Sequence, residues 1–171
     1  MLTTKANFTS EEWGKLLASP MIAGMAITAA DPSGLWGLLK EGMAGGWALL
    51  EARQSNQANP LVKAVAEDFA TTEGRTAARA AVDARFKGAK FDGLKDKALA
   101  ELKSISGILD AKAPDDAAPF KAWLQNVAQK AAEAGKEGGF LGFGGVAVSE
   151  AEKATLVEIS AALSRTGTAT A

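Results

Sequence analysis

Residues 8–32, FTSEEWGKLLASPMIAGMAITAADP, contain three successive signals for the start of an α-helix. In the first, Thr9 is placed to cap a helix and Glu12 to reach back to the cap, which is the capping-box pattern. Phe8 before the cap and Trp13 four residues after it have the spacing of a hydrophobic staple. This stretch therefore predicts a helix that begins directly after Thr9.

The other two signals pair a capping residue with proline. Ser19-Pro20 and Asp31-Pro32 each join a residue that favours the N-cap to a proline, which favours the first helical position. Asn59-Pro60 repeats the pattern further along the chain. We therefore predict that each pair ends one helix and starts the next, since strands rarely tolerate such repeated breaks.

Hydrophobic periodicity predicts the remaining helices. Residues 33–47, 60–70, 73–86, 92–110 and 115–135 have helical patterns, and Ser149 with Glu152 forms a second capping box before a last helix. No segment shows sustained alternation of apolar and polar residues. The sequence predicts an all-α fold, a compact bundle of seven or eight helices, in a single domain over residues 1–171. We expect an ordered core over about 8–165 and a frayed C-terminal tail.

The composition is that of a globular protein and limits the partners. Hydrophobic residues make up 47% of the 171 residues, charged residues 23%, and the formal net charge is −1. Such a charge gives no general attraction to nucleic acid. Residues 1–12 lack the apolar stretch of a signal peptide, and the longest apolar run, residues 21–30, is about half of a membrane span. We expect a cytoplasmic protein with no transmembrane segment and no nucleic-acid partner.

The chain contains no His, no Cys and no Tyr. This absence excludes Ser-His-Asp and Cys-His catalysis, thiol chemistry and His-based metal sites. Most carboxylates fall in the first turn of a predicted helix, where they favour the helix dipole. We predict no enzymatic activity, no catalytic or metal-binding residue and no cofactor; the remaining alternative is an enzyme that uses carboxylates or lysine.

A glycine-rich helical segment carries the candidate ligand site. Five glycines in residues 33–47 are explained either by close helix packing or by a ligand groove lined by Trp36, Met43 and Trp47. Asp31 is either an N-cap or a ligand for a hard cation, together with backbone carbonyls. The candidate ligand-binding residues are Asp31, Trp36 and Trp47.

The segment GKEGGFLGFGG, residues 135–145, combines flexible glycines with large apolar side chains. It lacks the pattern of a phosphate-binding loop. Its apolar side chains either fold back onto the bundle or form an exposed loop that binds a partner. The candidate partner-binding residues are Phe140, Leu141 and Phe143.

The last third of the chain resembles the TerB-like (tellurite-resistance-type) helical domains of bacteria, and the whole chain resembles an uncharacterised bacterial helical family. The matching residues are Val148-Ser149-Glu150-Ala151-Glu152 followed by Leu156, Ile159 and Leu163. Ala29-Ala30-Asp31 with Gly34 resembles a second copy, which implies a duplicated helical hairpin. Gly144-Gly145 replaces the Asp-Gly of these domains, so the resemblance implies no metal site there.

Two functions remain open from the sequence. The preferred one is a non-enzymatic helical protein that acts through protein–protein contacts, either with a partner protein or by self-association. The alternative is a TerB-like module that binds a small molecule or a cation.

Overall fold

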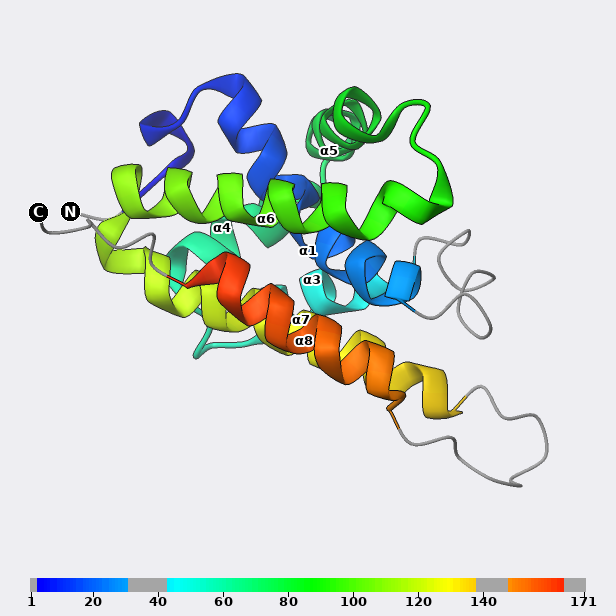
Figure 1. The fold of residues 1–171 in the computed structure, drawn as a ribbon. Coiled ribbons are helices and arrows are strands. Elements are labelled where there is room, and N and C mark those ends of the chain that lie inside the picture. The colour runs from blue at the N-terminus through cyan, green and yellow to red at the C-terminus, as the bar shows by residue number, and fades with distance from the viewer. Residues whose placement is uncertain (1–2, 31–42, 138–147, 165–171) are drawn as a thin grey trace, which may run out of the picture.

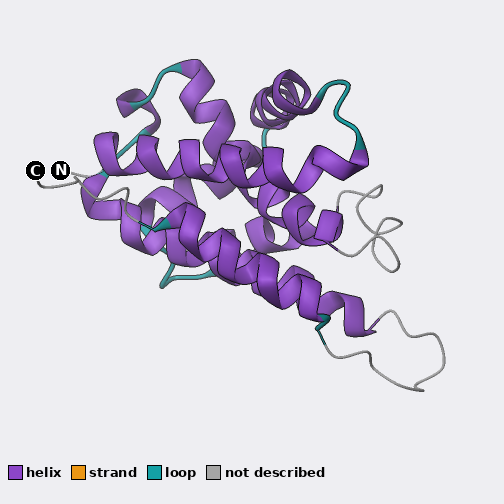
Figure 2. Cartoon of the chain, viewed as in Figure 1, coloured by secondary structure: helices purple, strands orange, loops and turns teal. Residues whose placement is uncertain are grey.

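The protein is an all-α bundle in a computed structural model that describes residues 3–30, 43–137 and 148–164. Within these ranges the chain forms seven α-helices and a short 3-10 helix, and no strand (Figures 1 and 2). They are η1 (Lys5–Asn7), α1 (Ser10–Ala30), α3 (Met43–Gln54), α4 (Pro60–Phe69), α5 (Thr72–Phe86), α6 (Phe91–Lys112), α7 (Pro114–Glu137) and α8 (Glu150–Leu163). The predicted fold class is confirmed.

Helix α1 is the centre of the bundle. It contacts each of the other six α-helices, and its residues are buried on every side over most of its length. A helix that is apolar all round must be enclosed by other elements, because no face of it can remain in water without losing the hydrophobic contribution. The apolar run at residues 21–30 is therefore core, and among the described residues no helix is long and apolar enough to cross a membrane.

The predicted break at Ser19-Pro20 is wrong, because α1 continues through Pro20. Proline has no N–H to donate to the carbonyl four residues earlier, which leaves the Leu16 oxygen without its helical partner. The Ser19 hydroxyl donates to that same oxygen at 2.7 Å. The serine thus replaces the missing hydrogen bond inside the helix instead of capping a new one, and packing on all sides holds the helix together.

The other start signals that fall in described residues are confirmed. The Thr9 N–H donates to Glu12 Oε2 at 2.7 Å, and the Glu12 N–H donates to Thr9 Oγ1 at 3.2 Å. Phe8 and Trp13 pack with ring centroids 5.7 Å apart, as a hydrophobic staple requires. Asn59 caps α4, which begins at Pro60. Asp31-Pro32 lies outside the described residues.

Helices α6, α7 and α8 pack together and cover one side of α1. In Figure 1, α6 and α8 run alongside each other across the front, and all three helices are in mutual contact. Only Ala113 separates α6 from α7, which forces a sharp corner. Ser149 and Glu152 form the predicted capping box of α8, with bonds of 2.9 and 3.2 Å. The Ser106 hydroxyl donates to the Leu163 carbonyl at 3.2 Å and fixes α8 onto α6.

Asp68 at the end of α4 ties the N-terminal segment to the bundle. Its Oδ2 accepts hydrogen bonds from Trp13 Nε1 at 2.6 Å and from Lys5 Nζ at 3.0 Å. Burial raises the pKa of Asp68, but the hydrogen bonds from Trp13 and Lys5 outweigh it and hold the pKa below its ordinary value of 3.8. The ionised form of Asp68 is therefore favoured by folding.

Asp68→Asn is expected to destabilise the protein at pH 7 by about 1–2 kcal/mol, because hydrogen bonds to a charged partner are lost. A carboxylate with a lowered folded-state pKa contributes stability above its unfolded pKa of about 3.9, and that contribution disappears as the pH falls through the folded value. The difference in the free energy of unfolding between wild type and variant should thus be full at pH 6–7 and close as the pH falls through the folded-state pKa, which lies below 3.8. Urea unfolding at several pH values measures this gap. The exposed neighbour Glu67 provides a control, since Glu67→Gln should leave stability within about 0.5 kcal/mol at pH 7.

Candidate functional site

Most of the candidate ligand-binding and partner-binding residues predicted from the sequence lie outside the described residues. Asp31, Trp36, Phe140, Leu141 and Phe143 all do. The backbone of Trp47 lies in α3, but its side chain is not among those described. The cation site, the groove of two tryptophans and the partner-binding loop therefore stay predictions, as does the duplicated hairpin.

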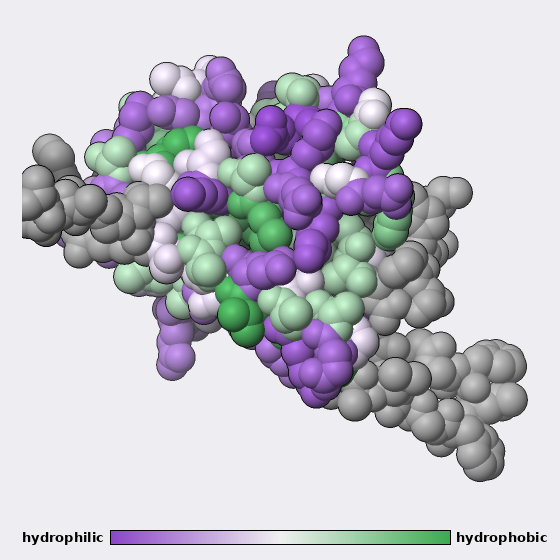
Figure 3. Space-filling model, viewed as in Figure 1, coloured by the Kyte–Doolittle hydropathy of each residue, from purple (hydrophilic) through white to green (hydrophobic). Residues whose placement is uncertain are grey.

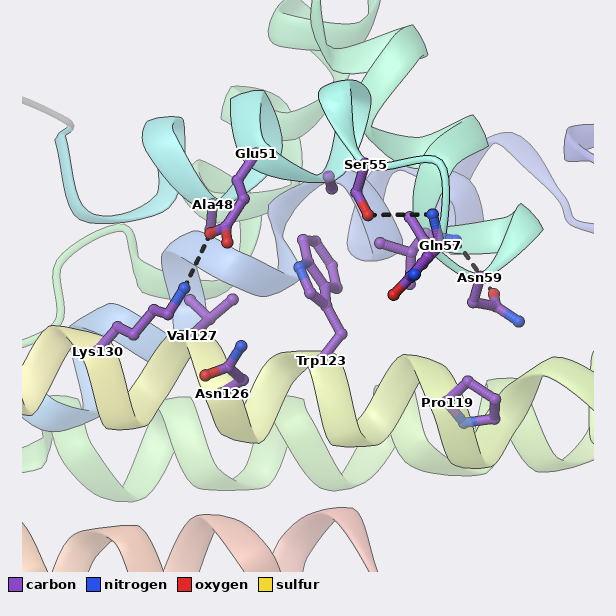
Figure 4. A pocket seen from close by; sticks show the side chains of 13 residues that line it. Ala48, Glu51, Ser55, Gln57, Asn59, Pro119, Trp123, Asn126, Val127 and Lys130 are labelled. Carbon is purple, nitrogen blue, oxygen red and sulfur yellow. Dashed lines mark hydrogen bonds and ion pairs between the residues drawn. The ribbon is translucent and has the colours of Figure 1, made fainter.

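Described residues line a cleft of about 470 Å³ between α7 and the α3–α4 segment (Figure 4). This volume falls within the range of about 300–1,000 Å³ that is typical of small-molecule sites. The side contributed by α7 consists of Pro119, Trp123, Asn126, Val127 and Lys130. The opposite side comes from α3, the following loop and the first turn of α4.

Trp123 forms the floor of the cleft. Pro119, Trp123 and Val127 follow one another at four-residue spacing, so they share one face of α7. The Trp123 ring is half-buried and packs edge to face with the fully buried Phe120, with centroids 5.3 Å apart and planes at 76°. In Figure 4 the indole rises from α7 toward α3, with Asn126 beside it. The core thus fixes the orientation of an indole that still faces the cleft.

The opposite side combines small apolar residues with a rigid loop. Ala48 and Ala52 are one helical turn apart on α3 and leave space above the indole. In the loop, Asn59 Oδ1 accepts from the backbone N–H groups of Leu61 and Val62, while Asn59 Nδ2 donates to Asp116 Oδ1 at 2.8 Å. Because these bonds anchor the loop to both α4 and α7, the cleft is held open by structure already formed.

One ion pair closes an end of the cleft. Lys130 Nζ lies 2.9 Å from Glu51 Oε2, which joins α7 to α3 across the opening (Figure 4). The Gln57 and Asn126 side-chain amides also line the cleft, and neither makes a hydrogen bond within the part of the chain that the structure describes. The cleft therefore offers an aromatic surface, two uncommitted carboxamides and a pair of charges that cancel.

A second, smaller hollow of about 240 Å³ lies at the corner between α6 and α7. Lys121 Nζ pairs there with Asp110 Oδ1 at 2.7 Å, and the Lys121 side chain is 9% exposed. Asp110 Oδ2 is enclosed and has no hydrogen-bond partner among the described atoms. Since the enclosed oxygen is out of reach of solvent, the pair is suited to holding the corner together and not to binding a ligand.

Few large hydrophobic side chains are exposed on the described surface. On the face that carries α6 and α8, hydrophobic residues are interspersed with polar ones (Figure 3). The large hydrophobic side chains exposed in the described ranges are Leu50 and Val157, on different helices. Single exposed hydrophobics are normal for a folded protein. The described residues also contain no group of three or more acidic side chains that could hold a metal ion.

Sequence reasoning missed this cleft, although it placed one of its residues correctly on a helix. Trp123 falls within the helical pattern predicted for 115–135, and its side chain is half-buried. Asn126 and Lys130, which adjoin it on the helix surface, were a signal that the surface beside it is polar. Comparison with protein-family models, with curated proteins and with solved structures finds no match. The TerB-like resemblance therefore stays a prediction.

Proposed function

We propose that this protein is a non-enzymatic binding protein whose small organic ligand occupies the cleft between α7 and the α3–α4 segment. The observation that carries the proposal is the half-buried Trp123 indole, fixed from behind by Phe120 and open to a preformed hollow of about 470 Å³. An apolar surface with a few convergent polar groups is the usual composition of a ligand site.

The side chains around the cleft favour binding over catalysis. Among the described residues that line it, the titratable groups are Glu51 and Lys130, which neutralise each other at 2.9 Å. The Ser55 hydroxyl, a possible nucleophile, instead accepts a hydrogen bond from the Gln57 N–H at 3.2 Å. A nucleophilic serine needs a general base to remove its proton, and among the described residues the Ser55 hydroxyl donates no hydrogen bond to one.

A thermal-shift screen of neutral metabolites against the full chain tests this proposal. Compounds that bind should raise the unfolding temperature of the wild type, and Trp123→Ala should abolish the rise because it removes the floor of the cleft. Gln125→Ala is the matched control, since Gln125 is exposed on the same helix and does not line the cleft. A screen without any stabilising compound, or one whose hits also stabilise Trp123→Ala, would contradict the proposal.

Protein–protein contact through Phe140, Leu141 and Phe143 remains the sequence-based prediction for a second function. Its residues lie outside those described, and the two exposed hydrophobics Leu50 and Val157 do not form a shared surface. The described residues therefore support ligand binding in the cleft as the first proposal.

A further inference from the structure

We propose that the ligand of the cleft is a neutral, polyhydroxylated ring, of the size of a mono- or disaccharide, that stacks on Trp123. This inference rests on the proposed function and adds the chemical class of the ligand. It follows from three properties of the part of the cleft that the structure describes, which are the aromatic surface of Trp123, the positions of the polar groups and the balance of charge.

The aromatic surface suits the face of a sugar ring. An indole has an electron-rich face that attracts weakly positive C–H bonds, and the flat side of a sugar ring presents such bonds. Phe120 packs against Trp123 at 76° and fixes the plane of the indole before any ligand arrives. The alanines of α3 leave room for a ring above it. A preorganised surface of this kind lowers the entropic cost of binding.

The polar groups stand on several sides of the indole. In Figure 4, Asn126 and the Glu51–Lys130 pair lie toward one side of Trp123, and Gln57 lies toward the other. Each carboxamide has two donors and one acceptor oxygen, the carboxylate accepts and the ammonium donates. A hydroxyl group both donates and accepts, so hydroxyls around the rim of a ring can match all of these groups. A nucleobase, whose ring carbons carry few hydroxyl-like groups, would match fewer of them.

The charge balance favours a neutral ligand. Glu51 and Lys130 are 2.9 Å apart, so a phosphate or carboxylate that approached the lysine would also meet the glutamate. Removing a charged ligand from water is costly unless the site supplies an opposite charge without competition. Sugar phosphates and nucleotides are thus disfavoured relative to uncharged sugars.

Ligand-observed NMR and isothermal titration on the full chain test the inference. The probes are glucose, galactose, mannose and N-acetylglucosamine, with the nucleobases adenine and uracil as neutral rings that carry no hydroxylated carbons. At least one sugar should bind, and Trp123→Ala should abolish its binding. Asn126→Ala and Gln57→Ala should each weaken binding by about 3–10-fold, as expected for one hydrogen bond. Gln125→Ala should leave the affinity unchanged.

The results separate this inference from the proposed function. If the nucleobases bind in a Trp123-dependent manner and the sugars do not, the ligand class is wrong and the cleft remains a binding site. If the metabolite screen finds only Trp123-dependent compounds that carry no hydroxylated ring, the ligand class is likewise wrong, and the cleft is still a binding site. If a sugar binds equally well to Trp123→Ala, that sugar does not bind in the cleft, and the inference is wrong. Asn126 and Gln57 are exposed, so their variants remain informative even where Trp123→Ala does not fold.

Discussion

Gly74→Ala is expected to destabilise the protein by about 3 kcal/mol, at the upper end of the range for overpacking. Gly74 is the third residue of α5 and is buried where the chain turns back from α4. A Cβ atom there would collide with the carbonyl oxygen of Asp68 and lie 2.5 Å from its carbonyl carbon. These are backbone atoms, so the collision cannot be relieved by rotating a side chain.

The collision would disturb a small hydrogen-bond network. The same Asp68 carbonyl accepts from the Thr71 N–H at 2.9 Å and from the Thr71 hydroxyl at 2.7 Å. Thr71 Oγ1 in turn accepts from the Gly74 N–H at 2.9 Å, which caps α5. A shift of this carbonyl would also displace the Asp68 carboxylate that holds Trp13 and Lys5. One methyl group thus weakens both the turn and the attachment of the N-terminal segment.

Gly93→Ala is the matched control, because Gly93 is likewise the third residue of its helix, α6. A Cβ at Gly93 meets nothing within 4 Å. Alanine should therefore be neutral or stabilise the protein by up to about 1 kcal/mol, through its better helix propensity. In a thermal melt, Gly74→Ala should lower the midpoint by roughly 6–12 °C, while Gly93→Ala should not lower it. Equal midpoints for the two variants would show that the close approach at Asp68 is absent.

These two glycines illustrate which parts of the structure a sequence can predict. Both occupy equivalent positions in their helices, so local patterns cannot tell them apart; only the turn from α4 to α5 makes one of them irreplaceable. The capping boxes at Thr9 and Ser149, in contrast, are complete within four residues, and both were predicted correctly. Local hydrogen-bond chemistry can be read from the sequence because all of its atoms are neighbours in the chain.

Pro20 and Trp123 show where local patterns fail. A Ser-Pro pair usually marks the start of a helix on a solvent-exposed chain. At Pro20 the surrounding helices enclose the chain, and the Ser19 hydroxyl donates a hydrogen bond to the Leu16 carbonyl oxygen in place of the missing N–H. Trp123 belongs to an apolar stripe, yet its exposure depends on how closely α3 approaches α7. Neither the burial of α1 nor the gap beside α7 is encoded in a short window of sequence. The candidate site therefore came from the tertiary arrangement.

Phe120→Ala is the change expected to cost the most stability, about 3–5 kcal/mol, which is the usual loss when a fully buried phenylalanine is truncated. Phe120 has no exposed surface and lies on the face of α7 that packs into the core. This loss is the sum of two free energies, the lost hydrophobic transfer free energy of the ring and the cost of the cavity that the ring leaves behind. Urea unfolding of the variant measures it. Phe120→Leu keeps most of the volume and should cost less than about 1.5 kcal/mol if its neighbours repack.

The same substitution tests whether the core and the cleft are coupled. Phe120 is the surface against which Trp123 rests, with ring centroids 5.3 Å apart, so truncation removes the support behind the indole. In Phe120→Ala, any ligand that depends on Trp123 should bind more weakly, even at temperatures where the variant is fully folded. Leu109→Ala is the comparison, because Leu109 is equally buried on α6 and does not line the cleft. If both variants lose similar stability but only Phe120→Ala loses affinity, the indole is preorganised by the core. Equal affinities would mean that Trp123 is held by the rim of the cleft instead.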